Sequence, residues 1–559
     1  MLITAASRPE ELAETGLRCW ADERFVIGWK GHLFLPGERA GAASVARFAA
    51  LLRDRPLPEL VQQLYGVFGL FVHDRQSGGW QLTVDNAGLY KIFYDDLGAS
   101  TSFLELLGDR GLGPERIGPL AVVEFLAHGF VIAPGTFVAG VRKLRDREIL
   151  ELTPGRPEPR ILEKDLCFPA DDDTETVLQY FADLATSLRD RRVSADLSGG
   201  FDSRLIVGML VHHGIDFEIA ITGEPGSADV VLSARLAQRL GKPFFYHRQE
   251  MSRFEEELPL VFLASDGQHE IRGFPRDRQN ALARLARGVE VFTHGGGGDQ
   301  FKDVHASQDF PFYGRAAVNY ERYYDLRWAP IRLPEALLSA SGRALLREVR
   351  ARTLARYAEL RRPTNHESYD RIAALLRAPE FFGRYFSNYI DMGLDVVAPF
   401  TEARIAEVGR RIPPWRRAMH RWHRAVLTHH CPEIAAVMTT DGYTASTAAR
   451  YWLPDLVGFL GNELRRGARK AGQRLLGRTY FEKPGFAQTN APDHVRRLRA
   501  TPQFTAAIAR LKDLGVLAAD TDPAALPDFH VPRVLTVGML LSHLEGRAIL
   551  AAAPAAAVS

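Results

Sequence analysis

The stretch VSADLSGGFDSRLIVGML places two serines, two glycines and an aspartate between an apolar segment and a helical pattern. Gly199 and Gly200 let backbone N–H groups approach an anion closely, and the first turn of the following helix adds partial positive charge. Ser198 and Ser203 can donate hydroxyl hydrogen bonds to the same anion. Asp202 would repel a phosphate unless Mg²⁺ joins its carboxylate to the phosphate oxygens. The pattern predicts a phosphate-binding loop with Asp202 as a magnesium ligand.

A second acidic residue follows a run of four glycines in VEVFTHGGGGDQF. The apolar letters before the glycines indicate a parallel strand, and ligands collect at the carboxyl ends of strands in open parallel sheets. We therefore expect Asp299 to face the same anion as Asp202 and to be a second magnesium ligand. The two carboxylates should converge within the span of one or two Mg²⁺ ions. A flexible surface loop with an incidental aspartate is the alternative.

The elements that must position these loops alternate between strands and helices after about residue 175. Strands are predicted at VSADL, DFEIAIT, PFFYH and VEVFTH, and helices at TETVLQYFADLATSLRDRR, SRLIVGMLVHHG, SADVVLSARLAQRLG and ALARLARG. Such alternation indicates βαβ units and a parallel sheet. From about residue 315 onward the chain is predicted to be mainly helical.

The first 160 residues or so contain short alternating runs and turn signals instead, which indicate antiparallel hairpins. Residues 155–175 have the proline and charge density of a linker. We therefore predict two domains, an N-terminal one at residues 1–165 and a second one at residues 175–545.

The composition of the 559-residue chain is that of a globular protein, with 46% hydrophobic and 25% charged residues. A formal net charge of +2 gives no reason to expect nucleic-acid or membrane binding. The three cysteines have no metal-type spacing and the N-terminus lacks a signal-peptide pattern, so we expect a cytoplasmic protein. The longest apolar tract contains Glu124, His128 and Pro134, and is predicted to be a core helix followed by a strand rather than a membrane span.

The loop SGGFDS resembles the pyrophosphate loop of the ATP-pyrophosphatase superfamily. The surrounding chain resembles the asparagine-synthetase-like branch, because its further motifs follow in the same order and spacing: FEIAITGEPGSADVVLSARLAQRLGKPFFYH, VEVFTHGGGGDQF and LDVVAPFTEARIAEVGRRIP. The segment LYGVFGLFVHDRQSGGWQLTVDNAGLYKIFYDD resembles the N-terminal glutaminase-type domain of that branch. The resemblance extends over most of residues 60–440.

This resemblance implies an α/β protein with two parts. The first is an N-terminal Ntn-type α+β sandwich, a degenerate glutaminase, and the second is a parallel-sheet ATP-pyrophosphatase domain with a helical extension. ATP and Mg²⁺ are the implied cofactors, with Asp202 and Asp299 as the metal ligands. The implied ATP- and pyrophosphate-binding residues are Leu197, Ser198, Gly199, Gly200, Asp202, Ser203, Thr222, Gly295 and Gly296.

The chain departs from the family pattern at three places. Leu2 stands where glutamine-using relatives have a cysteine nucleophile, so glutamine hydrolysis is not expected, as in β-lactam synthetases and lasso-peptide cyclases. Gly296 stands at the position of a family glutamate, which leaves space for a larger substrate but removes a base. Thr440 lies near the position of a family lysine. The candidate catalytic residues are Asp395, as a base, and Lys483 or Arg424, as replacements for that lysine.

The resemblance and these departures together predict an AMP-forming carbon–nitrogen ligase that adenylates a carboxylate and transfers the acyl group to an amine. The expected substrates are small-molecule or peptide carboxylates and amines of specialised metabolism, with a lasso-type macrolactam cyclase as one case. A homodimer, or docking to biosynthetic partner proteins, is a further expectation. The alternatives are a non-catalytic ATP-binding or scaffold homologue, and an amidotransferase that uses free ammonia.

Overall fold

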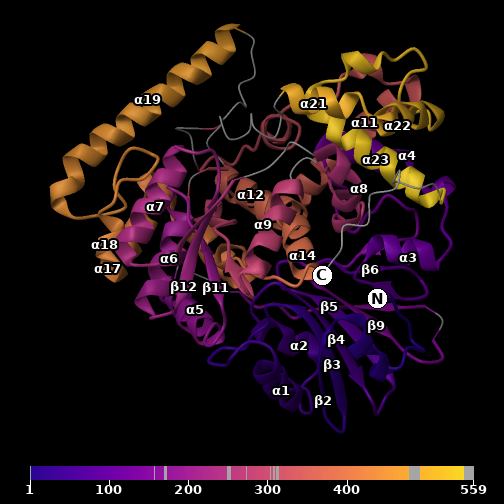
Figure 1. The fold of residues 1–559 in the computed structure, drawn as a ribbon, viewed down its shortest axis with the longest axis horizontal. Helices are drawn as coiled ribbons and strands as arrows, with labels where there is room; N and C mark the ends of the chain where they lie inside the picture. Colours follow the sequence, from indigo (N-terminus) through magenta and orange to yellow (C-terminus); the bar gives the residue numbers. More distant parts are fainter. Residues whose placement is uncertain are drawn as a thin grey trace.

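The computed structural model describes residues 2–156, 158–168, 173–248, 254–271, 274–302, 304–305, 309, 314–476 and 492–546. Its N-terminal part is built on antiparallel sheets and lies at the bottom of Figure 1, drawn in indigo. A parallel sheet with its helices follows in purple and magenta, and further helices lie above it. Lys483 and the C-terminal tail after residue 546 are outside the described residues.

The N-terminal part contains a six-stranded and a four-stranded sheet, and each described strand pair in them is antiparallel. The larger sheet has the order β10 (Arg160–Glu163), β9 (Glu148–Leu152), β5 (Gly79–Val84), β4 (Phe68–Asp74), β3 (Phe25–Gly31) and β2 (Arg18–Ala21). The smaller sheet has the order β1 (Leu2–Ile3), β7 (Ala99–Ser100), β6 (Phe93–Tyr94) and β8 (Arg142–Lys143). The helices of this part are α1 (Ala42–Leu51), α2 (Leu57–Leu60), α3 (Phe103–Asp109) and α4 (Pro119–His128).

Strand β4 shows why the larger sheet is buried on both faces. Its residues Phe68 and Leu70 pack into a core with α1 and α2, whereas Phe71, which points to the opposite face, packs into a different core. We call the first the N-terminal core. The second includes Tyr90, Phe292, Phe386 and Val396 and therefore joins the two parts of the chain. We call it the shared core.

The parallel sheet has the order β13 (Phe244–His247), β12 (Phe217–Thr222), β11 (Val193–Asp196), β14 (Val291–Thr293) and β15 (Asp395–Val397). All four strand pairs are parallel, which confirms the parallel sheet predicted from alternating strands and helices. Strand β15 joins the sheet from a region predicted to be mainly helical.

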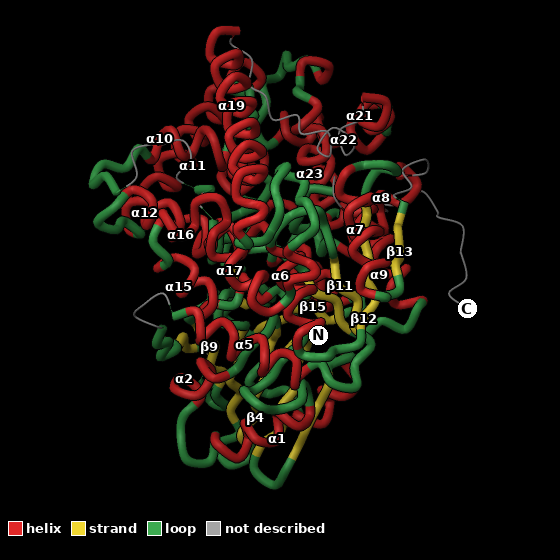
Figure 2. Tube along the Cα trace, turned by 90° about the vertical axis from the view of Figure 1, so that its left-hand side faces the viewer, coloured by secondary structure: helices red, strands yellow, loops and turns green. Residues whose placement is uncertain are grey.

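Alternate residues of these short strands point to opposite faces of the sheet. Val291 and Val397 pack with helices α5 (Thr174–Ser187), α6 (Asp202–His212) and α17 (Arg421–His430). Their neighbours Phe292 and Val396 pack with α9 (Phe274–Ala286) and α14 (Gly383–Asp391) in the shared core. Figure 2 shows α6 and α9 beside the yellow strands of this sheet. The N-terminal part therefore packs against the parallel sheet through α9 and α14.

The described part of the chain contains further helices. They are α7 (Ala228–Leu240), α8 (Phe254–Ala264), α10 (Tyr320–Tyr323), α11 (Ala340–Glu359), α12 (Asn365–Ile372), α13 (Ala378–Phe381), α15 (Ala403–Arg411), α16 (Pro414–Arg417), α18 (Pro432–Ala435), α19 (Trp452–Leu476), α21 (Pro492–Arg499), α22 (Pro502–Asp513) and α23 (Val531–Leu544). Helix α19, in orange, projects from the body of the protein in Figure 1. Helix α23 packs against α4 in a core that joins the C-terminal helices to the N-terminal part.

Two local predictions differ from the structure. Residues 160–163 lie in the expected linker but form β10, the edge strand that pairs with β9, because Ile161 and Leu162 continue the hydrogen-bonded ladder. The apolar tract forms α4 as predicted, but no strand lies between α4 and residue 141. Among the residues described, no helix combines the length and the apolar character of a bilayer-spanning segment.

Candidate functional site

The SGGFDS loop, residues 198–203, connects the carboxyl end of β11 to the first residues of α6. Ser203 Oγ accepts a hydrogen bond from the Ser198 N–H at 3.0 Å, and the two serine hydroxyl oxygens lie 3.0 Å apart. The Gly200 N–H donates to Ser198 Oγ at 3.3 Å. The hydroxyls and the N-terminus of α6 therefore gather at one point, as the sequence predicts for an anion-binding turn.

Asp229 and Thr440 hold the first glycine of the SGGFDS loop. The Gly199 N–H donates to Asp229 Oδ1 at 2.7 Å, and Gly199 O accepts a hydrogen bond from the Thr440 N–H at 3.1 Å. A Cβ at Gly199 would lie 2.3 Å from Thr440 Cγ2, so any larger residue there would require Thr440 or the loop to shift. In this arrangement Asp229 uses the Gly199 N–H, which is therefore not directed at a ligand.

The carboxylate of Asp202 lies between a lysine and a histidine. Lys302 Nζ donates to one carboxylate oxygen, and His423 Nε2 lies 3.0 Å from the other. Burial alone would raise the pKa of Asp202, but Lys302 and His423 together hold it well below its usual range. Burial lowers the pKa of His423, so Lys302 supplies the positive charge at neutral pH. Neither Lys302 nor His423 was among the site residues predicted from the sequence.

The second motif lies directly against the first. A Cβ at Gly298 would lie 2.2 Å from Asp202 Cγ, and a Cβ at Gly295 would lie 3.0 Å from the Ser203 backbone nitrogen. Asp299 lies in a short turn, Gly298–Phe301, and Lys302 follows this turn directly. Burial opposes the charge on Lys302, but the charges of Asp202 and Asp299 raise its pKa above the ordinary value. The structure therefore brings Asp202 and Asp299 to one lysine.

The protein offers few side chains to a metal ion here. No group of three or more His, Cys, Asp and Glu side chains that could hold a metal occurs in the described part of the chain. Mg²⁺ is commonly held by one or two carboxylates together with phosphate oxygens and water, so Asp299 fits a metal that arrives with a nucleotide. Asp202 does not fit this role as arranged, because Lys302 and His423 contact its two oxygens.

Three other residues from the predicted nucleotide-binding set lie near the loop or on the same sheet edge. Leu197 is buried, and its N–H donates to Ala220 O at 3.1 Å. Thr222 ends β12, where its hydroxyl donates to Asn280 Oδ1 at 2.7 Å. The space beside Gly296 is not open as expected, because a Cβ there would lie 2.7 Å from the ring of Phe382.

Asp395 lies at the opposite end of the sheet from the SGGFDS loop. It pairs with Val291, which in turn pairs with Val193 at the start of β11, roughly 16 Å along the strand direction from Ser198. Arg18 binds its carboxylate through two hydrogen bonds of 2.8 Å. Burial opposes the charge on Asp395, yet Arg18 lowers its pKa. We therefore assign Asp395 to the join between the two parts of the chain and not to proton transfer.

Arg424 points to the base of α19 instead of the loop. Its Nε donates to Ser446 O at 3.1 Å, and its guanidinium pairs with Asp455, which also accepts the Thr444 N–H at 2.7 Å. The contacts that the structure gives Arg424 thus fix the start of α19. Lys483 lies outside the described residues, so its proposed role stays a prediction.

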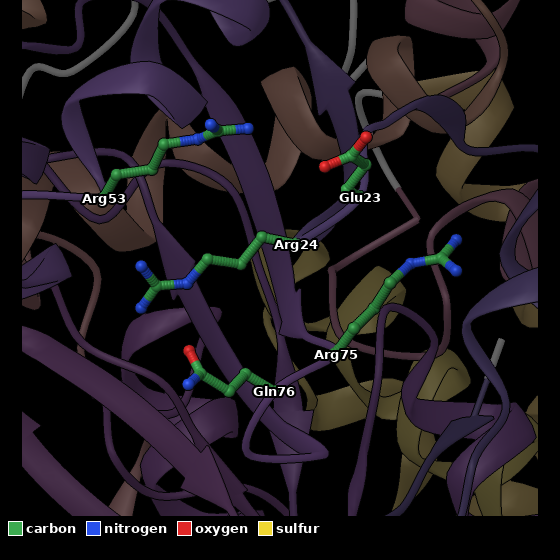
Figure 3. A pocket seen from close by; sticks show the side chains of 5 residues that line it. All are labelled: Glu23, Arg24, Arg53, Arg75 and Gln76. Carbon is green, nitrogen blue, oxygen red and sulfur yellow. The ribbon is translucent and has the colours of Figure 1, made fainter.

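The protein also has a strained backbone segment next to the SGGFDS loop and a separate hollow on its N-terminal part. Met419 and His420 both have left-handed backbones, with φ of 54° and 55°, and the His420 ring stacks on Phe201 of the SGGFDS loop at 4.0 Å. Such strain in bulky residues is concentrated at functional sites. A hollow of about 400 Å³ on the N-terminal part is lined by Arg24, Arg53 and Arg75, but Figure 3 shows their charged ends pointing in different directions. We assign no function to it.

Comparison with known families covers the region that contains this site. Residues 184–434 match the family model described as asparagine synthase. All five parallel strands, the SGGFDS loop and Asp299 lie within the matched segment. The match implies an ATP-dependent, AMP-forming ligase in general, with use of ATP and Mg²⁺. No curated protein matches the chain.

Proposed function

We propose that the protein is an ATP- and Mg²⁺-dependent ligase that adenylates a carboxylate and transfers the acyl group to an amine without hydrolysing glutamine. One observation carries this proposal. The SGGFDS loop and the Asp299 turn, which follow neighbouring parallel strands, meet at the carboxyl edge of the sheet inside the matched segment.

The first chemical step would form the acyl-adenylate. A carboxylate oxygen of the substrate attacks the α-phosphorus of ATP, the bond from that phosphorus to the bridging oxygen breaks, and pyrophosphate leaves. Ser198 and Ser203, at the N-terminus of α6, would donate hydrogen bonds to the departing pyrophosphate. Mg²⁺ bound with ATP would neutralise phosphate charge, with Asp299 as its protein ligand. The ammonium of Lys302 adds positive charge at the same place.

The second step would form the amide. The amine nitrogen attacks the acyl carbon, the bond to the AMP oxygen breaks, and the amine loses a proton. Neither Asp395 nor Arg424 is placed to assist this step. We propose that the substrates are specialised metabolites or peptides, with a lasso-type macrolactam as one case. We also propose that the protein is cytoplasmic and forms a homodimer or docks to biosynthetic partner proteins.

The N-terminal part would be a retained glutaminase-type scaffold. Leu2 lies in β1, paired with Ser100, where a glutaminase would need a nucleophile. Contacts with the parallel-sheet part give the retained fold a structural purpose. Lys143 Nζ donates to Glu380 at 2.8 Å, and the Gly66 N–H donates to Glu402 at 3.0 Å.

Pyrophosphate release from ATP, measured with a panel of carboxylic acids and peptides, tests the proposal. Wild-type protein should release pyrophosphate only with a suitable acid, and glutamine should yield no glutamate. Asp202→Asn should lower the rate about 10- to 100-fold or more, because Lys302 loses the carboxylate that positions its ammonium in the site. Asp216→Asn is the matched control, since the Asp216 side chain is fully exposed and should not affect the rate.

A non-catalytic ATP-binding homologue is the second candidate, and the pairing of Lys302 with Asp202 favours it. ATP binding without pyrophosphate release from any acid would support this candidate and contradict the ligase. Amide formation that requires added ammonia would instead indicate an amidotransferase that uses free ammonia.

A further inference from the structure

We infer that Lys302 is a built-in cation that takes the place of a metal ion at Asp202. This inference rests on the proposed function, because it states which cations the proposed nucleotide site needs. The ion pair between Asp202 and Lys302 is nevertheless a property of the protein without any nucleotide. Asp202 is compensated by an ammonium, and Mg²⁺ is needed only at Asp299.

The short turn after the glycine run places Lys302 close to both aspartates. Asp299 lies in the turn Gly298–Phe301, and the Lys302 N–H donates to Asp299 O at 3.2 Å. This closed turn holds the start of the Lys302 side chain beside Asp299, while its Nζ reaches the Asp202 carboxylate. Both side chains of that ion pair are largely buried, with exposed fractions of 16% and 17%.

The positive charge of Lys302 balances the negative charge of Asp202. The negative charges that act on Lys302 are those of Asp202, Asp299 and Asp441. His423 Nε2 lies 3.0 Å from the Asp202 carboxylate and is fully buried, whereas Lys302 Nζ donates to that carboxylate. Lys302 is therefore the charged partner of Asp202 among the contacts that the structure describes. A buried carboxylate needs such a partner, and an ammonium meets that need without a metal.

Steric fit also supports the inference. Asp202 lies so close to Gly298 that a Cβ there would be 2.2 Å from Cγ, and Lys302 and His423 contact its two oxygens. A metal ion at the oxygen bound by Lys302 would have to compete with its ammonium for the same carboxylate. Removing the lysine should therefore create a metal site that the wild-type protein lacks.

The test uses Mg²⁺ alone with the full-length chain and no nucleotide. In the wild type, saturating Mg²⁺ should leave the melting temperature unchanged. In Lys302→Met, which keeps most of the side-chain length but removes the charge, Mg²⁺ should raise the melting temperature by several degrees. The double variant Asp202→Asn with Lys302→Met should lose this response, and Lys302→Arg, which keeps the charge, should behave as the wild type does.

The matched control is Lys242→Met, which removes a lysine from the exposed pair with Asp216 and should gain no Mg²⁺ response. A Lys302→Met protein that folds without gaining a response would overturn the inference. If that variant does not fold, calorimetric titration of the wild type decides. Mg²⁺ binding to the wild type that Asp202→Asn abolishes would contradict the inference. A wild type that shows no such binding would support it. Because ATP is absent throughout, these results are independent of whether the wild type releases pyrophosphate.

Discussion

Gly199 is a residue of the SGGFDS loop at which the structure leaves little room for a side chain. Replacing it with alanine would place a Cβ 2.3 Å from Thr440 Cγ2 and 3.0 Å from Asp229 Oδ1. Relief of such overpacking typically costs about 1–3 kcal/mol. We expect Gly199→Ala to lower the free energy of unfolding by about that amount in urea titrations, because the loop must separate from Thr440.

The neighbouring glycine provides the control for this prediction. A Cβ at Gly200 would meet only Ser198 Oγ, at an ordinary 3.5 Å. Gly200→Ala should therefore unfold at the same urea concentration as the wild type. Equal destabilisation of the two variants would show that glycine flexibility, and not the contact with Thr440, determines the effect.

Sequence reasoning at the scale of single residues found the loop but not its surroundings. The predicted grouping of Ser198, Ser203 and Asp202 follows from local order in the chain, which sequence displays directly. The contact of Asp202 with His423 joins residues far apart in the chain, and no spacing rule indicates it. Lys302 had a weak signal, since it stands three residues after Asp299. The metal role of Asp299 stays a prediction, whereas Asp202, which pairs with Lys302, does not fit the metal role predicted for it.

At the scale of elements, helix α6 is fixed to the 434–438 turn by one buried arginine. Arg204 donates to Ile434 O at 3.4 Å, to Met438 O at 3.1 Å and to Gly199 O at 3.4 Å, and it has no exposed surface. Burial lowers the pKa of Arg204 to about 10, so it remains charged at neutral pH. It therefore joins the loop, its helix and the turn.

We expect Arg204→Met to destabilise the protein by about 2–3 kcal/mol, because these buried carbonyl groups lose their donor. The same change should weaken ATP binding, since Gly199 loses part of its support. Chemical unfolding and a nucleotide titration measure the two effects. Arg235→Met, on the exposed face of α7, should alter neither. An unchanged affinity for ATP in Arg204→Met would show that this arginine does not support the ATP site.

The elements themselves were the most predictable part of the structure. The strands β11, β12, β13 and β14 and the helices α6 and α7 lie where the changes of period place them, whereas α8 was not predicted and α9 begins at Phe274, before the predicted ALARLARG. The edge strand β10 was missed because its sequence, RILE, is short, charged at both ends and close to prolines, as a linker would be. Edge strands need only one partner, so their own pattern is weak.

At the scale of the whole molecule, Glu402 is a buried acid at the contact between the two parts. It accepts the Gly66 N–H, and burial together with the nearby Asp85 raises the pKa of Glu402 to about 8. The folded state therefore holds a proton that the unfolded state releases at lower pH. Stability contributed by this group is greatest at low pH and falls as pH rises towards 8.

Glu402→Gln should remove this contribution. The melting temperature of the variant should fall less than that of the wild type as pH rises from about 5 to about 8, and the two slopes should agree above that range. Glu359→Gln, at an exposed position near the end of α11, should retain the wild-type slope. Parallel curves for Glu402→Gln and the wild type would contradict the raised pKa.

The shared core has a consequence for the order in which the protein folds during synthesis. The N-terminal core, with Phe48, Phe68 and Ile149, is complete once the first 150 or so residues have emerged. Tyr90, by contrast, cannot pack against Phe386 until roughly 300 further residues have been added, which takes about 15–60 s at ordinary translation rates. We expect one face of the first sheet to be covered only in part, by residues of the N-terminal part such as Leu12 and Leu144, throughout that interval, which is when a chaperone would find it.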